Sequence, residues 1–186
     1  MGWKKTAAVV FILSLVFINI YLFSGLFNNN VACYRDMCVY GQTANITKEL
    51  RQMVSSADSV IIYVEGDASA TQTTGYIDQV FLQLYADMIA ANKAPTYALI
   101  SLDSSGTAVN CSCETYSNGN STACVNSSLD YCRSLSPKEG QLMFIIKYPD
   151  YPKNEVILTD NIVDIRANSG ASLSGMFDVL RKMIFP

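Results

Sequence analysis

The longest apolar run of the chain lies near its N-terminus. The 21 residues from Ala7 to Phe27 carry no charge, and a helix of that length spans roughly 30 Å, the thickness of the hydrocarbon core of a bilayer. Lys4 and Lys5 precede this run, which places the N-terminus in the cytoplasm by the positive-inside rule. The pattern predicts a cytoplasmic tail over residues 1–6 and a type II, single-pass signal anchor over residues 7–27.

Three other interpretations of the N-terminus carry less weight. A cleaved signal peptide has a shorter apolar region and a small-residue cleavage site, whereas this run is followed by Asn28-Asn29-Asn30. A lipid attached to Cys33 requires an apolar residue where Asn30 stands. The first six residues match the myristoylation pattern, but an acyl group adds little to a chain that already spans the bilayer.

Beyond the anchor, residues 28–46 have the polar composition of a tether, and an extracytoplasmic domain is predicted over residues 47–186. Residues 47–55 have apolar positions at helical spacing, and residues 59–64 form a β-branched run typical of a buried strand. An apolar stripe at helical spacing then predicts a long helix over residues 73–91, and residues 96–102 form the next strand. Strand, helix and strand in this order predict a βαβ unit with parallel strands.

The second half of the domain begins with a change of pattern. Residues 104–137 are rich in Ser, Asn, Gly and Cys and lack apolar periodicity, so a disulfide-rich loop is predicted, with a short helix over residues 129–135. A strand follows over residues 142–148. Two short runs, 155–159 and 162–166, are separated by Asp160-Asn161 and predict a hairpin. Apolar spacing then predicts a C-terminal helix over residues 172–185.

These elements define the predicted fold class. It is α/β, with an N-terminal transmembrane helix and a mixed-sheet domain of two or three layers. The order of a βαβ unit, a Cys-rich loop, a β-hairpin and a closing helix resembles the thioredoxin-like arrangement. That family carries a C-x-x-C motif at the start of its long helix, near residues 72–75 here, where this chain has no cysteine. The resemblance therefore extends to the order of elements and not to the activity.

Composition narrows the class of protein. The chain is 50% hydrophobic and 16% charged, with a formal net charge of −3, which excludes a disordered chain and argues against a nucleic-acid binder. It contains no histidine, which excludes Ser-His-Asp and Cys-His catalysis and histidine-liganded zinc. With Lys4 and Lys5 inside, eleven basic residues face sixteen acidic residues outside, so the predicted ectodomain carries a net charge of −5.

The six cysteines point to an oxidising compartment. All follow the predicted anchor, and an even number of cysteines in an extracytoplasmic chain is typical of disulfides. If Cys33 pairs with Cys38, then Cys111 and Cys113 pair with Cys124 and Cys132. A zinc site is the alternative, but its usual signature of two C-x-x-C pairs or His ligands is absent from the sequence.

Four N-x-[ST] sequons agree with this orientation, because all of them follow the anchor. They predict glycosylation on exposed loops, although Asn, Ser and Thr are also common loop residues. The sequon positions are Asn45, Asn110, Asn120 and Asn126.

Two acidic strings follow the strands of the predicted βαβ unit. Each has the form D-x-[ST]-x-[ST], beginning at Asp67 and at Asp103. The second, with Ser105 and Thr107, is similar to the D-x-S-x-S metal-binding loop of von Willebrand factor A-type adhesion domains. That resemblance implies a Mg²⁺ or Ca²⁺ site built from Asp67, Asp103, Ser105 and Thr107, since such hard cations prefer oxygen ligands. The alternative is that these residues only cap turns after the strands.

Three functional hypotheses follow. The leading one is a non-enzymatic, membrane-anchored binding or surface-structural module with an extracytoplasmic protein or glycan partner, with no cofactor and no nucleic acid. The second is a divalent-cation-dependent adhesion or hydrolytic domain that uses the acidic strand ends. The third is a degenerate thioredoxin-like redox protein. No catalytic residues are assigned, because the sequence contains no nucleophile–base constellation and no nucleotide-binding motif.

Overall fold

The computed structural model of the 186-residue chain describes residues 30–67, 73–103, 105–117, 119–124, 128–148 and 151–185. The predicted tail and anchor, residues 1–27, lie outside this set. Within the described residues, no helix combines the length and the apolar character that crossing a membrane requires.

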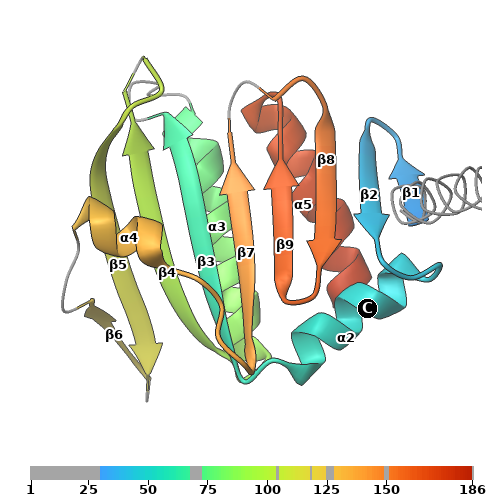
Figure 1. Cartoon of the computed structure of the whole chain (residues 1–186), viewed down its shortest axis with the longest axis horizontal. Helices are drawn as coiled ribbons and strands as arrows, with labels where there is room; N and C mark the ends of the chain where they lie inside the picture. The colour runs from blue at the N-terminus through green and yellow to red at the C-terminus, as the bar shows by residue number, and fades with distance from the viewer. Residues whose placement is uncertain are drawn as a thin grey trace, which may run out of the picture.

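The described part of the chain forms one mixed sheet of nine strands with four helices (Figure 1). The strands are β1 (Asn30–Tyr34), β2 (Met37–Gly41), β3 (Ser59–Asp67), β4 (Ala94–Leu102), β5 (Ala108–Ser117), β6 (Asn120–Ala123), β7 (Gln141–Lys147), β8 (Asn154–Thr159) and β9 (Ile162–Arg166). The helices are α2 (Ile46–Ser56), α3 (Thr73–Ala90), α4 (Leu129–Ser134) and α5 (Gly170–Ile184). The strand order across the sheet is β1-β2-β8-β9-β7-β3-β4-β5-β6.

The predicted βαβ unit is confirmed. β3 and β4 are parallel neighbours, with Ile62 opposite Tyr97, and α3 connects them. The β-branched run of β3 is buried because β4 and β7 pair with it on both sides, both in parallel. Such central parallel strands read as continuous apolar runs because both of their faces are covered.

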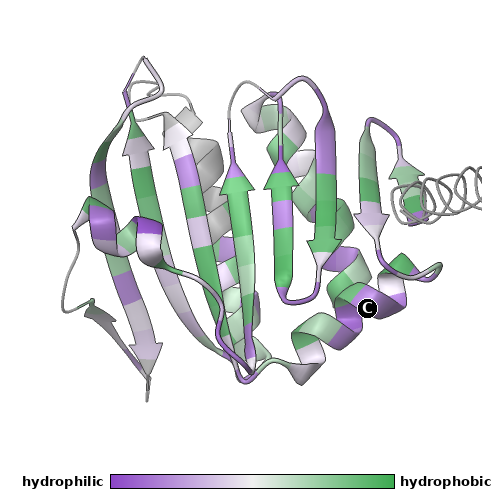
Figure 2. Cartoon of the chain, viewed as in Figure 1, coloured by the Kyte–Doolittle hydropathy of each residue, from purple (hydrophilic) through white to green (hydrophobic). Residues whose placement is uncertain are grey.

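Three helices cover one face of the sheet. α2, α3 and α5 lie behind it in the view of Figure 1, while α4 lies in front of β4 and β5. The main core lies between the three helices and the middle strands, whose mainly hydrophobic character is visible in Figure 2. Leu50 of α2, Phe144 of β7 and Leu173 of α5 are among its fully buried side chains. The domain is thus two-layered over most of its width, and α4 adds a third layer towards β5.

The tether predicted over residues 28–46 is wrong for residues 30–41, because these form the β1–β2 hairpin. β2 pairs in parallel with β8, and its alternate residues Met37 and Val39 are buried in the main core. The Cys33–Cys38 disulfide joins directly opposed residues of β1 and β2, with a Cα–Cα distance of 4.1 Å. The apolar residues Met37 and Val39 at alternate positions indicated a strand. The tether was predicted because the segment as a whole has a polar composition.

The disulfide-rich loop predicted over residues 104–137 is also corrected. Most of it forms β5 and β6, an antiparallel pair that extends the sheet from β4. Exposed polar residues alternate with buried Cys111 and Cys113 along β5. The buried positions of this alternating strand pattern are occupied by cysteines. A strand is usually indicated by Val, Ile and aromatic residues at such positions, so this one was not evident from the sequence.

The β8–β9 hairpin occupies a different position in the sheet from the one that the thioredoxin-like order predicts. β8 and β9 form the predicted antiparallel hairpin, but it is β9 that pairs with β7, in parallel. Four further strands, β1, β2, β5 and β6, extend the sheet at its two ends. The resemblance to the thioredoxin-like arrangement is therefore limited to the order of the central elements along the chain.

Candidate functional site

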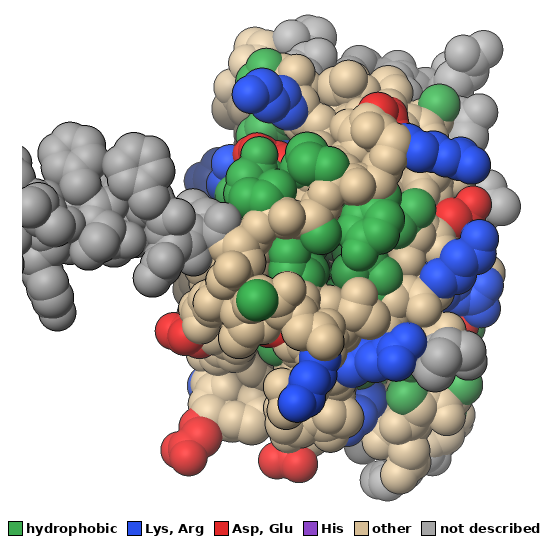
Figure 3. Space-filling model, turned by 90° about the vertical axis from the view of Figure 1, so that its right-hand side faces the viewer, with side chains coloured by type: hydrophobic (Ala, Val, Ile, Leu, Met, Phe, Trp, Pro, Cys, Tyr) green, Lys and Arg blue, Asp and Glu red, His purple; other side chains and the backbone are tan. Residues whose placement is uncertain are grey.

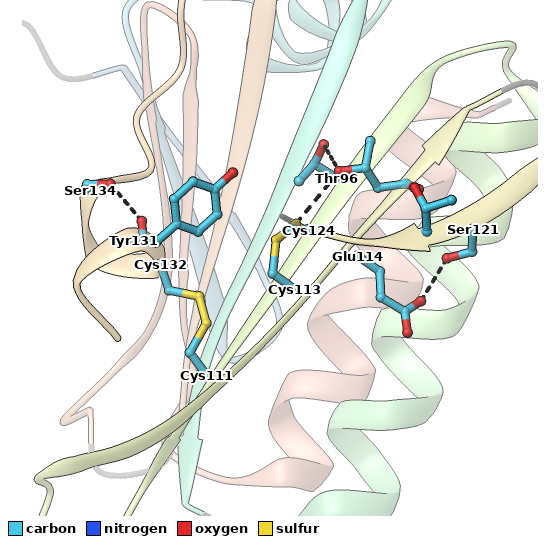
Figure 4. The surroundings of a disulfide bond; sticks show 11 residues. Thr96, Cys111, Cys113, Glu114, Ser121, Cys124, Tyr131, Cys132 and Ser134 are labelled. Atoms are coloured by element: carbon cyan, nitrogen blue, oxygen red, sulfur yellow. Dashed lines mark hydrogen bonds between the residues drawn. A yellow bond between two sulfur atoms is a disulfide. The ribbon is translucent and has the colours of Figure 1, made fainter. Parts of the chain in front are cut away.

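The strongest candidate for a functional surface is the cross-linked end of the sheet, formed by β5, β6 and α4, which we call the braced edge. Cys111 and Cys113 lie on the same face of β5 and bond outward to different elements (Figure 4). Cys111 bonds to Cys132 of α4, with a Cα–Cα distance of 6.5 Å, and Cys113 bonds to Cys124 just after β6, at 5.4 Å. The predicted disulfides are present, and each of the two close cysteines takes a separate partner.

These disulfides form part of a small second core beneath α4. Its buried members are Ala98, Ile100, Cys111, Cys113 and Cys132. A helix as short as α4, with six residues, does not persist alone in water, since helix nucleation is costly. The disulfide at Cys132, and the Ser128 side chain that accepts a hydrogen bond from the Tyr131 amide, hold it against the sheet.

The outer boundary of the braced edge is β6. All four residues of this strand are exposed, and among the described residues β6 pairs with β5 alone. Three hydrogen bonds besides the ladder help to fix it: the Ser121 hydroxyl donates to Glu114 at 2.7 Å, the Thr122 hydroxyl to the Thr115 carbonyl at 3.4 Å, and the Cys124 amide to the Cys113 carbonyl at 3.0 Å. A rigid edge strand with unpaired backbone groups and hydroxyl side chains is a ready template for hydrogen bonding to another molecule.

Two of the four predicted glycosylation positions lie on the braced edge. Asn110 on β5 and Asn120 on β6 are both exposed. Asn45 lies elsewhere, at the start of α2, and is also exposed. Asn126 lies outside the described residues. Glycosylation of these positions stays a prediction, and the exposure of the three described side chains is compatible with it.

Asn45 has a structural role that is separable from glycosylation. Its side-chain oxygen accepts a hydrogen bond of 3.0 Å from the Lys48 amide and so caps α2. Asn45→Ala is expected to lower the free energy of unfolding by about 1 kcal/mol, the usual value of such a cap. Thr47→Ala is the matched control, because it destroys the same sequon and keeps the cap. Urea unfolding of the unglycosylated proteins measures both; equal stabilities of the two variants would contradict the capping role.

The first residues of the two acidic strings lie at the ends of neighbouring strands. Asp67 ends β3 opposite Leu102 of β4 in the ladder, and Asp103 follows Leu102. Residues 68–72, most of the first string, lie outside the described residues. The described part of the chain contains no group of three or more Cys, Asp or Glu side chains placed to hold a metal ion.

The Asp103 string closes the turn between β4 and β5. One carboxylate oxygen of Asp103 accepts hydrogen bonds from the Ser105 amide at 2.9 Å, the Ser105 hydroxyl at 2.6 Å and the Thr107 amide at 2.9 Å. An antiparallel strand follows, instead of the helix that follows this loop in the adhesion domains. The arrangement is the turn cap that was the alternative interpretation of the string.

The same hydrogen bonds lower the pKa of Asp103 below its ordinary value of 3.8, with the Ser105 hydroxyl as the largest cause and the Thr107 amide as the next. A lowered pKa in the folded state stabilises the fold above the unfolded pKa, and this contribution is lost as the pH falls through the folded value. Asp103→Asn is therefore expected to lower the thermal midpoint at neutral pH, and the difference from the parent is expected to vanish in strong acid. A pH series of thermal unfolding measures this; a difference that persists in strong acid would contradict it.

A charged cluster on the open face of the sheet was not predicted from the sequence. Arg166 of β9 pairs with Asp164 at 2.7 Å and with Glu155 of β8 at 3.1 Å, and the Tyr151 ring lies 5.7 Å from its guanidinium carbon. Hydrogen bonding to Asp164 is the main reason that the pKa of Arg166 is raised. In the sequence, the alternation of Asp164 and Arg166 with Val163 and Ile165, which are buried in the structure, indicated that the two charged residues share one face of a strand. The partner Glu155 became evident only from the strand register.

A cavity of about 160 Å³ lies between α3 and α5, above β7 and β9. Its walls are mainly apolar, with Leu84, Phe144 and Phe177 among them. At its rim Arg181 of α5 makes a two-point contact with Asp87 of α3, at 2.5 and 2.8 Å. The carboxylate of Asp87 already pairs with this guanidinium, and Asp178 is the other charged residue that lines the cavity.

Comparison with known proteins adds no functional information: no protein-family model, no curated protein and no solved structure matches this chain.

Proposed function

We propose that the chain is a membrane-anchored, extracytoplasmic binding module that presents its braced edge to a protein partner. The observation that carries the proposal is the position of this edge in the sheet. β6 lies at the opposite end of the nine-strand order from β1, the strand that directly follows the predicted anchor. Eight strand spacings of about 4.8 Å place the braced edge roughly 38 Å from the anchored end.

The compartment follows from the cysteines and the sequons. All six cysteines are paired in disulfides, and such bonds persist in oxidising compartments. A net charge of −5 beyond the anchor keeps the domain soluble. The braced edge is rigid because one disulfide ties β5 to α4 and another ties β5 to the residue that follows β6. A rigid surface loses little conformational entropy on binding.

The partner contacts follow from the chemistry of β6. Its sequence is Asn-Ser-Thr-Ala, which offers amide and hydroxyl groups together with one unpaired backbone edge. An extended segment of an extracytoplasmic protein pairs with such an edge by adding a strand to the sheet. Short, polar edges resist indiscriminate pairing, so specificity comes from the side chains around β6, including Glu114 and any glycan on Asn120.

Photo-crosslinking on intact cells tests this proposal. A photoreactive amino acid at Thr122 of β6 is expected to yield one discrete cross-linked species, because this position lies at the proposed contact. The matched control is Gln52, an exposed residue on α2, where no species of the same mass is expected. The absence of any adduct at Thr122, or the same adduct at both positions, would contradict the proposal.

The topology has its own test. Protease added to intact cells is expected to degrade residues 28–186 and to leave the N-terminal peptide within the membrane, because the positive-inside rule places Lys4 and Lys5 in the cytoplasm. Permeabilised cells provide the control, in which the N-terminal tail is also cleaved. Protection of the folded domain in intact cells would reverse the orientation and remove the extracytoplasmic assignment.

A further inference from the structure

Exposed apolar side chains gather near the anchored end of the sheet. The large hydrophobic side chains exposed in the described part of the chain are Val31, Tyr34, Leu82 and Val109. Two of these four, Val31 at 49% and Tyr34 at 37% exposure, lie on the five-residue strand β1. Figure 3 looks onto this end of the molecule and shows apolar side chains in the middle of the face, with Lys and Arg as well as Asp and Glu side chains around them.

A shallow hollow lies beside β1. It measures about 370 Å³ and is lined by Tyr34, Arg35, Gly175, Asp178, Val179 and Lys182. Val179 of α5 and Ala32 of β1 pack at the margin of the main core, so apolar surface continues from the core to the outside here. Among the described residues, neither Arg35 nor Lys182 makes an ion pair.

The distance to the predicted anchor is short. The apolar run ends at Phe27, and β1 begins at Asn30. Three residue steps span at most about 10 Å even when fully extended. The side chain of Asn30 also donates to the Gln42 carbonyl at 3.0 Å, so β1 is fixed to the domain from its first residue. A domain attached in this way remains within reach of the lipid headgroups.

We propose that the β1 face, defined as Tyr34, Arg35, Val179 and Lys182, rests on the headgroup layer of the chain's own membrane. Tyrosine is favoured at this depth because its ring is apolar and its hydroxyl is polar. Arg35 and Lys182 donate hydrogen bonds to lipid phosphate oxygens while their alkyl stems lie along apolar surface. This inference rests on the anchoring in the proposed function, and it orients the braced edge away from the membrane.

A second copy of the chain is the competing occupant of the β1 face. In a two-fold interface the same surface meets itself, so Arg35 and Lys182 of each copy would approach the other pair. Asp178 is the one acidic residue lining the hollow, and it offsets only part of that repulsion. Lipid phosphate complements both cations, and the unpaired outer backbone of β1 finds partners among hydrated headgroups.

Lipid-specific fluorescence quenching tests the proposal in the full chain. The native tryptophan is first removed by Trp3→Phe, and a reporter is introduced by Tyr34→Trp. The chain is reconstituted in vesicles of phosphatidylcholine with brominated acyl chains near the headgroup. We expect the emission to fall by roughly half relative to unbrominated vesicles, because Trp at the interface lies near the bromines. The matched control is Val109→Trp, an exposed position on β5 at the other end of the sheet, where no quenching is expected.

Each other outcome has a defined meaning. A chain that fails to float with the vesicles overturns the anchor and, with it, both proposals. Co-flotation with no quenching of the Tyr34→Trp variant overturns the contact with lipid and leaves the anchor intact. The reporter can instead be shielded from aqueous iodide without being quenched by lipid. If this shielding is lost when each nanodisc holds only one chain, the β1 face contacts a second copy. Quenching that is unchanged by Arg35→Gln and Lys182→Gln overturns the role of the cations.

Discussion

Replacement of Phe144 by alanine is expected to lower the free energy of unfolding by about 3–5 kcal/mol, the usual cost of truncating a buried aromatic side chain. Phe144 is 1% exposed on β7, the strand between β3 and β9. Its side chain also forms part of the wall of the cavity between α3 and α5. Truncation enlarges a space that already exists, and the surrounding side chains and helices relax only partially into it.

Urea unfolding of the full chain in detergent micelles, followed by circular dichroism, measures this effect. Leu82→Ala is the matched control, since Leu82 is an apolar residue with 59% exposure on α3 and its truncation is expected to change stability by no more than about 0.5 kcal/mol. Similar losses for the two variants would contradict the assignment of Phe144 to the core.

Loss of the disulfide between Cys111 and Cys132 is expected to have the next largest effect. The bond closes a separation of 21 residues, for which the loop-entropy relation gives about 3 kcal/mol. The Cys111→Ala, Cys132→Ala double variant also frees α4, which is too short to persist alone. The braced edge is then expected to lose its protection from hydrogen exchange, while the βαβ unit retains it.

The disulfide between Cys33 and Cys38 provides the comparison. It closes a separation of only 5 residues, for which the same relation gives about 2 kcal/mol. Thermal unfolding of the two double variants is expected to rank them in this order. Proteolysis is expected to begin within the braced edge in the first and near β1 in the second. The reverse ranking would contradict the role of the longer bridge.

The elements with strong local periodicity were predictable. The stripe of α3 includes Val80, Leu84 and Met88, all of which are buried, and the β-branched run of β3 lies in the middle of the sheet. In these segments the side chains that enter the core recur at the period of the element itself, so their pattern is visible without knowledge of the partner. The disulfides followed from the count of cysteines and their position after the predicted anchor.

The candidate site was predictable only in its parts. The cysteines and the sequon residues Asn110 and Asn120 were identified, but they were assigned to a loop because β5 is polar between its cysteines and β6 is polar and short. The sequence left two interpretations of the Asp103 string open, a metal site and a turn cap. The structure shows that Ser105 and the Thr107 amide donate hydrogen bonds to one carboxylate oxygen of Asp103, in the turn between β4 and β5.

The sequence by itself determined the apolar N-terminal run, the parallel βαβ unit, the closing helix and the presence of disulfides, because each of these depends on local pattern or composition. Only the tertiary structure decided which strands are neighbours: β2 pairs with β8, more than a hundred residues away along the chain, and Arg166 meets Glu155 across a hairpin. It also placed the β1 face and the braced edge at opposite ends of one sheet. Strand pairing depends on register between distant segments whose alternating patterns fit many partners, so the packing of the whole domain has to select among them.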